Sequence, residues 1–376
     1  LVRSLNALGE VVADPDLWGY MAFGRLFWET GRFPYEDIFA YVPTLNPWVY
    51  HEWLTGVVFF PLYRALGAPG LQLLKFLLGL ATVGLVYRTA RLRGADFGSA
   101  LLGLWGIQVF LALGYSPVRA QIFTYLFFAL SLYLLERARL QGKWGGVWAL
   151  ALLQIPWCNL HGGFVAGLGI LGLYGGGEAL ARQRFWPYLA AGGAGTLATL
   201  VNPYGLEYWT YITRAVTMPR PEISEWASII TAWQAGLPKE PLIYYLALAV
   251  FAVALAAWAR WREITPILVF SLTLYLGFKH LRHQVFFFLA AGSYLPVLLS
   301  AFFRKILGAQ RPLTLRGRLA TWLPPALACC LALIYGCKFI AKNPWSLELP
   351  TTPNQHNQAA IHYPVGAVEY LIRGGG

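Results

Sequence analysis

The sequence predicts an all-α membrane protein, a bundle of about ten or eleven transmembrane helices with further helices along its outer surface. Of its 376 residues, 57% are hydrophobic and only 12% are charged, whereas soluble globular chains carry about 25% charged residues. Apolar runs recur at close to the ~17–25 residues that a helix needs to cross a bilayer. The chain also holds 16 Trp, 21 Tyr and 23 Phe, which suit the surfaces where a membrane meets water.

Ten apolar segments are the candidate crossings, and one further crossing before Leu1 would make eleven. We expect residues 1–341 to form one transmembrane domain, and residues 342–376 to begin an outer C-terminal segment that stops early. The candidate crossings are 71–90, 97–114, 119–136, 146–160, 163–181, 186–202, 241–259, 264–280, 285–303 and 319–340.

Basic residues indicate how these segments are oriented. They gather in alternate loops, which places those loops in the cytoplasm, because loops rich in Lys and Arg stay inside. The net charge of +12 then belongs to loops that flank a membrane, so no nucleic-acid partner is expected. The basic loops contain Arg88, Arg91 and Arg93; Arg137, Arg139 and Lys143; Arg182 and Arg184; Arg260 and Arg262; and Arg304, Lys305, Arg311, Arg316 and Arg318.

Residues 13–66 are predicted to form an outer acidic loop with two helices that lie along the membrane surface. In residues 17–33, apolar side chains surround one Arg and one Glu. Residues 49–66, "VYHEWLTGVVFFPLYRAL", are apolar but short, with a His-Glu pair near their start and a proline within. If this segment crossed the membrane, every later loop would change sides and the Arg-rich loops would lie outside.

The outer loop also concentrates carboxylates. Residues 13–41, "ADPDLWGYMAFGRLFWETGRFPYEDIFAY", hold five of the 17 acidic residues in the chain. Pro15 favours an extended turn between Asp14 and Asp16, so both carboxylates can converge on one acceptor group or one divalent cation. Asp16 is also well placed to cap a helix that begins at Leu17, and the sequence fits either role or both.

Two outer loops carry cations against the positive-inside trend. The stretch "SPVRAQ" holds Arg119 and Gln121, and the stretch "KHLRHQ" holds Lys279, Arg282 and His283. Because Arg can bind a phosphate through two parallel hydrogen bonds, Arg119 and Arg282 are candidate phosphate ligands, with the other side chains assisting. The alternative is that these side chains reach toward lipid headgroups.

Four further outer residues are candidate substrate ligands. His161, in "NLHGG", can bind a sugar hydroxyl or a phosphate, or it is an interfacial histidine with ordinary partners. His51 and Glu52 either join the site or cap their helix. Asp37 either completes the site or holds its own loop.

Several kinds of site are absent from the sequence. No set of His and Cys residues has transition-metal spacing, and no haem- or nucleotide-binding motif occurs. A divalent cation on Asp14 and Asp16 is the metal role that the sequence leaves open. The acids of the longest outer loop, Glu222 and Glu225, are expected to be solvated.

The order of these parts resembles the GT-C superfamily of membrane glycosyltransferases. The matching stretches are "DPDLWGYMAFGRLFWETGRFPYEDIFAY", "PWVYHEWL", "NLHGGFVAG", "LVNPYGLEYW" and "HLRHQVFFFLAA", within about residues 14–300, with a weaker match at "YPVGAVEYLIRGGG". More narrowly, the chain is similar to a group of uncharacterised bacterial membrane proteins related to the protein O-mannosyltransferases and the aminoarabinose transferase.

The resemblance implies an enzyme that moves a sugar from a polyprenyl-phosphate or pyrophosphate carrier to a protein, lipid or glycan acceptor outside the membrane. It also implies a catalytic base among the opening acids, for which we favour Asp16, with Asp14 as the alternate. The expected location is a bacterial inner membrane, with the active face periplasmic or extracellular. Membrane lipid and other membrane proteins are the expected partners.

Two other functions fit part of the sequence. A non-catalytic membrane subunit with this fold would bind lipid or a partner complex, and would tolerate replacement of both Asp14 and Asp16. A transporter of a lipid-linked solute would need ionisable residues in the middle of its spans. The predicted spans have almost none, and Lys75 lies near the end of one.

Overall fold

The fold is all-α, as the sequence predicts. The computed structural model describes residues 2–348 except 41, 116, 308–317 and 342. Within these ranges every regular element is a helix, and one isolated bridge joins Val12 to Glu348. Three helical stretches are long enough and apolar enough to cross a membrane, which indicates a membrane protein. They are Trp53–Leu92, Lys239–Trp258 and Leu281–Ile306.

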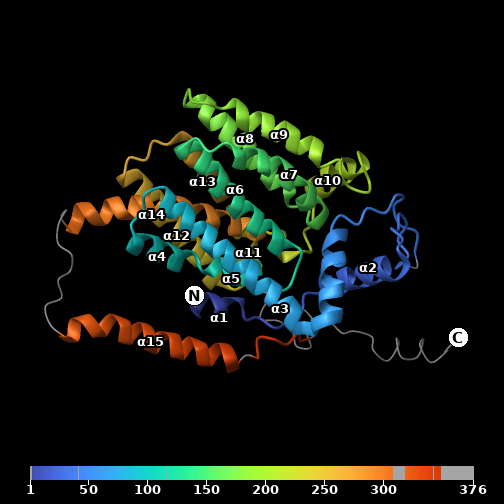
Figure 1. Cartoon of the computed structure of the whole chain (residues 1–376), viewed down its shortest axis with the longest axis horizontal. Coiled ribbons are helices and arrows are strands. Elements are labelled where there is room, and N and C mark those ends of the chain that lie inside the picture. The colour runs from blue at the N-terminus through green and yellow to red at the C-terminus, as the bar shows by residue number, and fades with distance from the viewer. Residues whose placement is uncertain (1, 41, 116, 308–317, 342, 349–376) are drawn as a thin grey trace.

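All ten segments predicted to cross the membrane lie largely in helices. The helices are α1 (Val2–Leu8), α2 (Asp16–Thr30), α3 (Trp53–Leu92), α4 (Phe97–Ile107), α5 (Val109–Tyr115), α6 (Gln121–Gln141), α7 (Gly145–Leu160), α8 (Phe164–Leu180), α9 (Trp186–Ala198), α10 (Glu207–Thr217), α11 (Ile229–Gln234), α12 (Lys239–Trp258), α13 (Ile264–Lys279), α14 (Gln284–Leu307) and α15 (Arg318–Ala341), with the short 3-10 turns η1 (Ser224–Trp226) and η2 (Leu281–His283). Most of the long helices run side by side, and α2 stands with the first part of α3 at one end of the bundle (Figure 1).

The segment predicted as one crossing at 97–114 lies in α4 and α5, which are separated only by Gln108, and the φ of −59° and ψ of −15° at Gln108 stay in the helical region. The hydroxyl of Tyr244 donates a hydrogen bond to the carbonyl of Gly106, close to this junction. Residues 97–115 therefore come close to the ~20 residues that span a bilayer. Helix α9 has only 13 residues. Helix α9 is therefore too short to cross the hydrocarbon core by itself.

Helix α3 joins the predicted surface helix to the first predicted crossing. A straight helix of its 40 residues would be ~60 Å long, about twice the hydrocarbon core of a bilayer. The chain turns at Gly67, where φ is 64° and ψ is −156°, and Pro61 and Pro69 flank this kink. Since glycine is the residue that adopts such angles readily, the sequence itself divides α3 into residues 53–66 and 68–92.

The two sets of loops lie at opposite ends of the bundle, as the alternating charge pattern predicts. At one end, the basic end, Arg93 contacts Glu136 at 2.5 Å and Glu263 at 2.7 Å, so three of the Arg-rich loops meet. At the other end, the site end, Arg119 lies before α6 and reaches Asp14. Helix α6 runs between the two ends over 21 residues, or ~30 Å.

The chain returns to the site end after α15. The backbone N–H of Ala13 donates to the carbonyl of Glu348 at 2.8 Å, and the N–H of Glu348 donates to the carbonyl of Val11 at 2.8 Å. Residues 343–348 therefore lie beside the start of the acidic loop. The rest of the predicted C-terminal segment, 349–376, lies outside the described residues.

Helices α2 and α3 touch backbone to backbone, and this contact shapes the site end. A Cβ added at Gly24 would lie 2.1 Å from the carbonyl oxygen of Gly56, and one added at Gly56 would lie 2.5 Å from that of Tyr20. Real Cβ atoms do not approach so closely, so both positions need glycine. The close approach lets the Tyr20 hydroxyl reach Glu52, at the start of α3.

We expect Gly24→Ala to force these helices apart and to destabilise the protein by about 1–3 kcal/mol, the usual cost of overpacking. Gly19→Ala is the matched control, because it lies on the same helix and its new Cβ would meet only the Tyr50 hydroxyl, at 3.7 Å. The control should gain up to ~1 kcal/mol from its higher helix propensity. Thermal unfolding in detergent, followed by circular dichroism, compares the two variants, and equal melting temperatures would contradict this packing.

Candidate functional site

Five charged side chains at the site end form one connected group, the arginine cluster, which consists of Asp14, Asp16, Arg119, Glu225 and Arg282. Arg119 is its centre: Nε lies 3.1 Å from Asp14 Oδ2, and Nη2 lies 3.4 Å from Asp16 Oδ2. Its Nη1 lies 3.2 Å from Glu225, whose other carboxylate oxygen lies 3.2 Å from Arg282 Nη1. The cluster joins the acidic loop, the start of α6 and the turns η1 and η2, four segments far apart in the sequence.

Asp14 and Asp16 have different surroundings. The side chain of Asp14 is 10% exposed and that of Asp16 is 59% exposed. Helix α2 begins at Asp16, and Asp14 Oδ1 accepts the backbone N–H of Asp16 at 2.9 Å. The carboxylate that satisfies this helix start is therefore Asp14, and the capping role considered for Asp16 is wrong. The carboxylate of Asp16 stays accessible from water.

Burial raises the pKa of Asp14 to about 6, against an ordinary value of 3.8. The charge of Arg119 opposes this rise, and the charge of Asp16 adds to it. Because the pKa in the folded protein is the higher one, the stability that protonated Asp14 contributes is present at low pH and is lost as the pH rises through about 6. A carboxyl pKa raised in this way is typical of functional sites.

A second group, the Glu52 cluster, consists of Glu52, Tyr20, His51 and His161. The Tyr20 hydroxyl donates to Glu52 Oε2 at 2.6 Å. Glu52 Oε1 lies 3.5 Å from His51 Nε2 and 3.3 Å from His161 Nε2. Burial by itself would raise the pKa of Glu52, but the two histidines and Tyr20 outweigh it and lower this pKa to about 2. Glu52 is therefore an ionised carboxylate that is largely shielded from water.

The position of the ring proton of His161 follows from its partners. Its Nδ1 lies 2.8 Å from the backbone nitrogen of Gly163, which can only donate, and 2.8 Å from the hydroxyl of Thr124. Nδ1 is therefore an acceptor, and the proton lies on Nε2, which faces Glu52. Burial lowers the pKa of His161 to about 4; Glu52 opposes this shift and Arg282 adds to it. A neutral His161 thus presents its N–H to an ionised Glu52.

The remaining predicted site residues lie around these clusters. Gln121 is the buried first residue of α6, and Lys279 is the exposed last residue of α13. His283 has a buried Nδ1 without a hydrogen-bond partner in the described part of the chain. Asp37 accepts the backbone N–H two residues further on at 3.0 Å, so it holds its own loop and joins neither cluster.

Glu225 belongs to the site, although its sequence context predicts a solvated loop residue. It contacts both arginines of the cluster. Its neighbour Trp226 packs against the Arg282 guanidinium at 4.6 Å. Tyr20 and Thr124 also contact the Glu52 cluster. The sequence does not predict these contacts, because a single hydroxyl in an apolar helix does not reveal the direction in which it points.

The described residues contain no group of three or more His, Cys, Asp or Glu side chains that could hold a metal ion. The sequence leaves open a divalent cation on Asp14 and Asp16, but the Arg119 guanidinium already contacts both carboxylates. A cation at this position would face the positive charge of Arg119 at short range. These two carboxylates do not make a cation site while Arg119 lies between them.

A scan of protein-family models finds no match to this chain, and a search of curated proteins finds none either.

Proposed function

We propose that this protein transfers a sugar from a polyprenyl-phosphate carrier to an acceptor at the outer surface of a bacterial inner membrane. The observation that carries the proposal is the arginine cluster, where carboxylates and arginines from distant segments converge at one end of the bundle. That end is opposite the Arg-rich loops, which the positive-inside rule assigns to the cytoplasm. A lipid phosphate and an acceptor from the water would meet there.

Asp16 is the proposed catalytic base, because its carboxylate is accessible to an acceptor that arrives from water. It takes the acceptor proton as the acceptor oxygen attacks the anomeric carbon of the sugar. The bond between that carbon and the phosphate oxygen breaks, the anomeric configuration inverts, and the carrier leaves as polyprenyl phosphate. Asp14 holds both Arg119 and the first N–H of α2, and so positions Asp16.

Arg282 is the proposed main phosphate ligand. All three nitrogens of Arg119 contact carboxylates, whereas Arg282 forms an ion pair with Glu225 through a single nitrogen. Packing on Trp226 fixes the direction of the Arg282 guanidinium. Exposed Lys279, three residues earlier, adds positive charge where the leaving phosphate becomes more negative.

A non-catalytic membrane subunit is the second candidate function. The observation in its favour is that Arg119 is already neutralised by Asp14, Asp16 and Glu225. Such a network holds four segments together without any ligand, and the fold could then bind lipid or a partner complex. The two candidates differ in whether the cluster opens to admit a phosphate.

A structure of the full chain in lipid nanodiscs with added polyprenyl phosphate separates these candidates. We expect the phosphate on Arg282, with Asp16 within about one water molecule's reach of it. Protein or structural lipid in that space would support the subunit instead. Arg282→Gln should weaken polyprenyl-phosphate binding about tenfold or more, while Arg262→Gln, an exposed change at the basic end, should leave it unchanged.

A further inference from the structure

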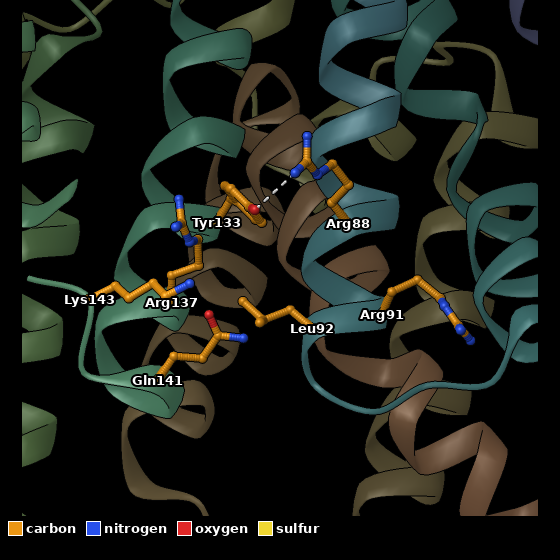
Figure 2. A pocket seen from close by; sticks show the side chains of 7 residues that line it. All are labelled: Arg88, Arg91, Leu92, Tyr133, Arg137, Gln141 and Lys143. Atoms are coloured by element: carbon orange, nitrogen blue, oxygen red, sulfur yellow. Dashed lines mark hydrogen bonds between the residues drawn. The ribbon is translucent and has the colours of Figure 1, made fainter. Parts of the chain in front are cut away.

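A separate hollow lies at the basic end, between the C-terminal turns of α3 and α6 (Figure 2). It is open to its surroundings and has a volume of about 490 Å³, which falls within the ~300–1,000 Å³ typical of small-molecule sites. Cationic and polar side chains dominate its lining, so it is unlike an apolar pocket for a hydrocarbon. The lining includes Arg88, Leu92, Tyr133, Arg137, Gln141 and Lys143.

The cations of this hollow lack carboxylate partners. Among the residues that the structure describes, no Asp or Glu forms an ion pair with Arg88, Arg137 or Lys143. At least three positive charges therefore line one open space without compensation. Such a space attracts an anion.

The nearby acids are already paired with other arginines. Glu136 precedes Arg137 in the chain, but it is buried between Arg93 and Arg139, at 2.5 and 2.9 Å. Glu263 contacts the same two arginines at 2.7 and 2.6 Å. These two acids and two arginines neutralise one another, so they leave the charge of the hollow unchanged.

Tyr133 holds two of the cations in place. Arg88 Nη2 donates to the Tyr133 hydroxyl at 3.3 Å, and its guanidinium lies 5.2 Å from the ring centroid. The Arg137 guanidinium lies 5.5 Å from the same centroid. Figure 2 shows both arginines beside Tyr133. Two cations held against one ring repel each other, and an anion bound in the hollow would offset this repulsion. Arg91 turns away in Figure 2 and donates to the carbonyl of Ala95 at 2.6 Å.

The donors of the hollow suit phosphate oxygens. Guanidinium groups can bind a phosphate through two parallel hydrogen bonds, and an ammonium such as that of Lys143 binds it as a point charge. Gln141 adds a neutral amide that can donate. The hollow lies ~30 Å along α6 from the arginine cluster, which is about the thickness of a bilayer core. Basic pockets between helices at a membrane surface are known to bind phospholipid headgroups.

We propose that this hollow binds a phosphate-bearing anion at the basic end of the bundle. The position of the hollow at a membrane surface favours the headgroup of an anionic phospholipid as the source of this phosphate group. Inorganic phosphate or pyrophosphate from water would offer the same chemical group. The proposal does not rest on the transferase function, because it uses none of the residues of the site end.

The test compares two double variants of the full chain in nanodiscs. Arg88→Gln with Arg137→Gln removes two charges from the hollow, and Arg260→Gln with Arg262→Gln removes two exposed charges at the same end but outside it. Native mass spectrometry counts the phosphatidylglycerol molecules retained from mixed phosphatidylglycerol and phosphatidylcholine nanodiscs. Titration calorimetry measures the binding of inorganic pyrophosphate.

We expect the hollow variant to bind phosphatidylglycerol at least about tenfold more weakly than the wild type, and the control variant to differ by less than about threefold. Loss of pyrophosphate binding alone would support the same site with a free anion as its source. Equal losses in both variants, or no binding of either probe to the wild type, would overturn the proposal. Lys143→Gln, in the loop after α6, should weaken binding without touching helix packing, so it gives a second test if the double variant misfolds.

Discussion

Replacement of Asp16 by Asn should lower the rate of sugar transfer by about 10²–10⁴-fold, the usual contribution of a positioned general base. Asn keeps the size of the side chain and can remain near Arg119, which lies 3.4 Å away in the native protein, but it cannot take a proton. Because the Asp16 side chain is mostly exposed, the fold should survive. The measurement is the release of polyprenyl phosphate from a panel of polyprenyl-phosphate sugars, detected by mass spectrometry.

The matched control is Glu36→Gln, which removes a carboxylate from the same outer loop at an exposed position outside both clusters. It should transfer sugar at the wild-type rate. If Asp14 is the base instead, Asp14→Asn will show the larger loss and the wild-type rate will rise as the pH rises through about 6. If both Asp14 and Asp16 can be replaced without loss, the transferase proposal is wrong and the subunit function remains.

Replacement of Glu136 by Ala should destabilise the protein by about 3–5 kcal/mol, the range for removing one partner from a buried ion-pair network. Its side chain is fully buried and lies 2.5 Å from Arg93 and 2.9 Å from Arg139. The hydroxyl of Tyr174 also donates to it, at 2.6 Å. Without Glu136, two guanidinium groups would share one partly exposed carboxylate, that of Glu263.

Equilibrium unfolding in mixed detergent micelles, together with the melting temperature, measures this loss. Glu222→Ala removes an exposed carboxylate from a loop at the site end, and it should change the free energy of unfolding by less than about 0.5 kcal/mol. A Glu136→Ala protein as stable as this control would mean that Arg93 and Arg139 find other partners. In that case the acids and arginines next to the basic hollow would also pair differently from the pattern described above.

Part of the candidate site could be predicted because its residues are unusual where they stand. Asp14 and Asp16 are carboxylates beside an apolar helix. Arg119 is a cation in a loop that the positive-inside rule predicts to be poor in basic residues. Glu225 could not be predicted in this way, because its partner Arg119 lies 106 residues away. A charged residue in a loop is usually solvated, and only the approach of a distant segment makes it part of a network.

The predicted helix at 97–114 lies in α4 and α5, and the single residue between them, Gln108, keeps helical backbone angles. Residues 97–114 are apolar over most of their length, which predicts one helix, because helix propensity acts locally. The bend in α3 at Gly67 agrees with the predicted boundary between the surface helix and the first crossing. A glycine flanked by two prolines interrupts a helix through local backbone conformation alone.

The sequence by itself determined that this protein is all-α, where its long helices lie, and which loops share an end. Those properties follow from local features, namely the length of apolar runs and the alternation of basic loops along the chain. Only the tertiary structure decided that three carboxylates surround Arg119, that His161 is neutral beside Glu52, and that the acids of the basic end are already paired. These depend on the distances and burial of side chains from helices far apart in sequence, because electrostatic interactions are set by proximity and by exclusion of water.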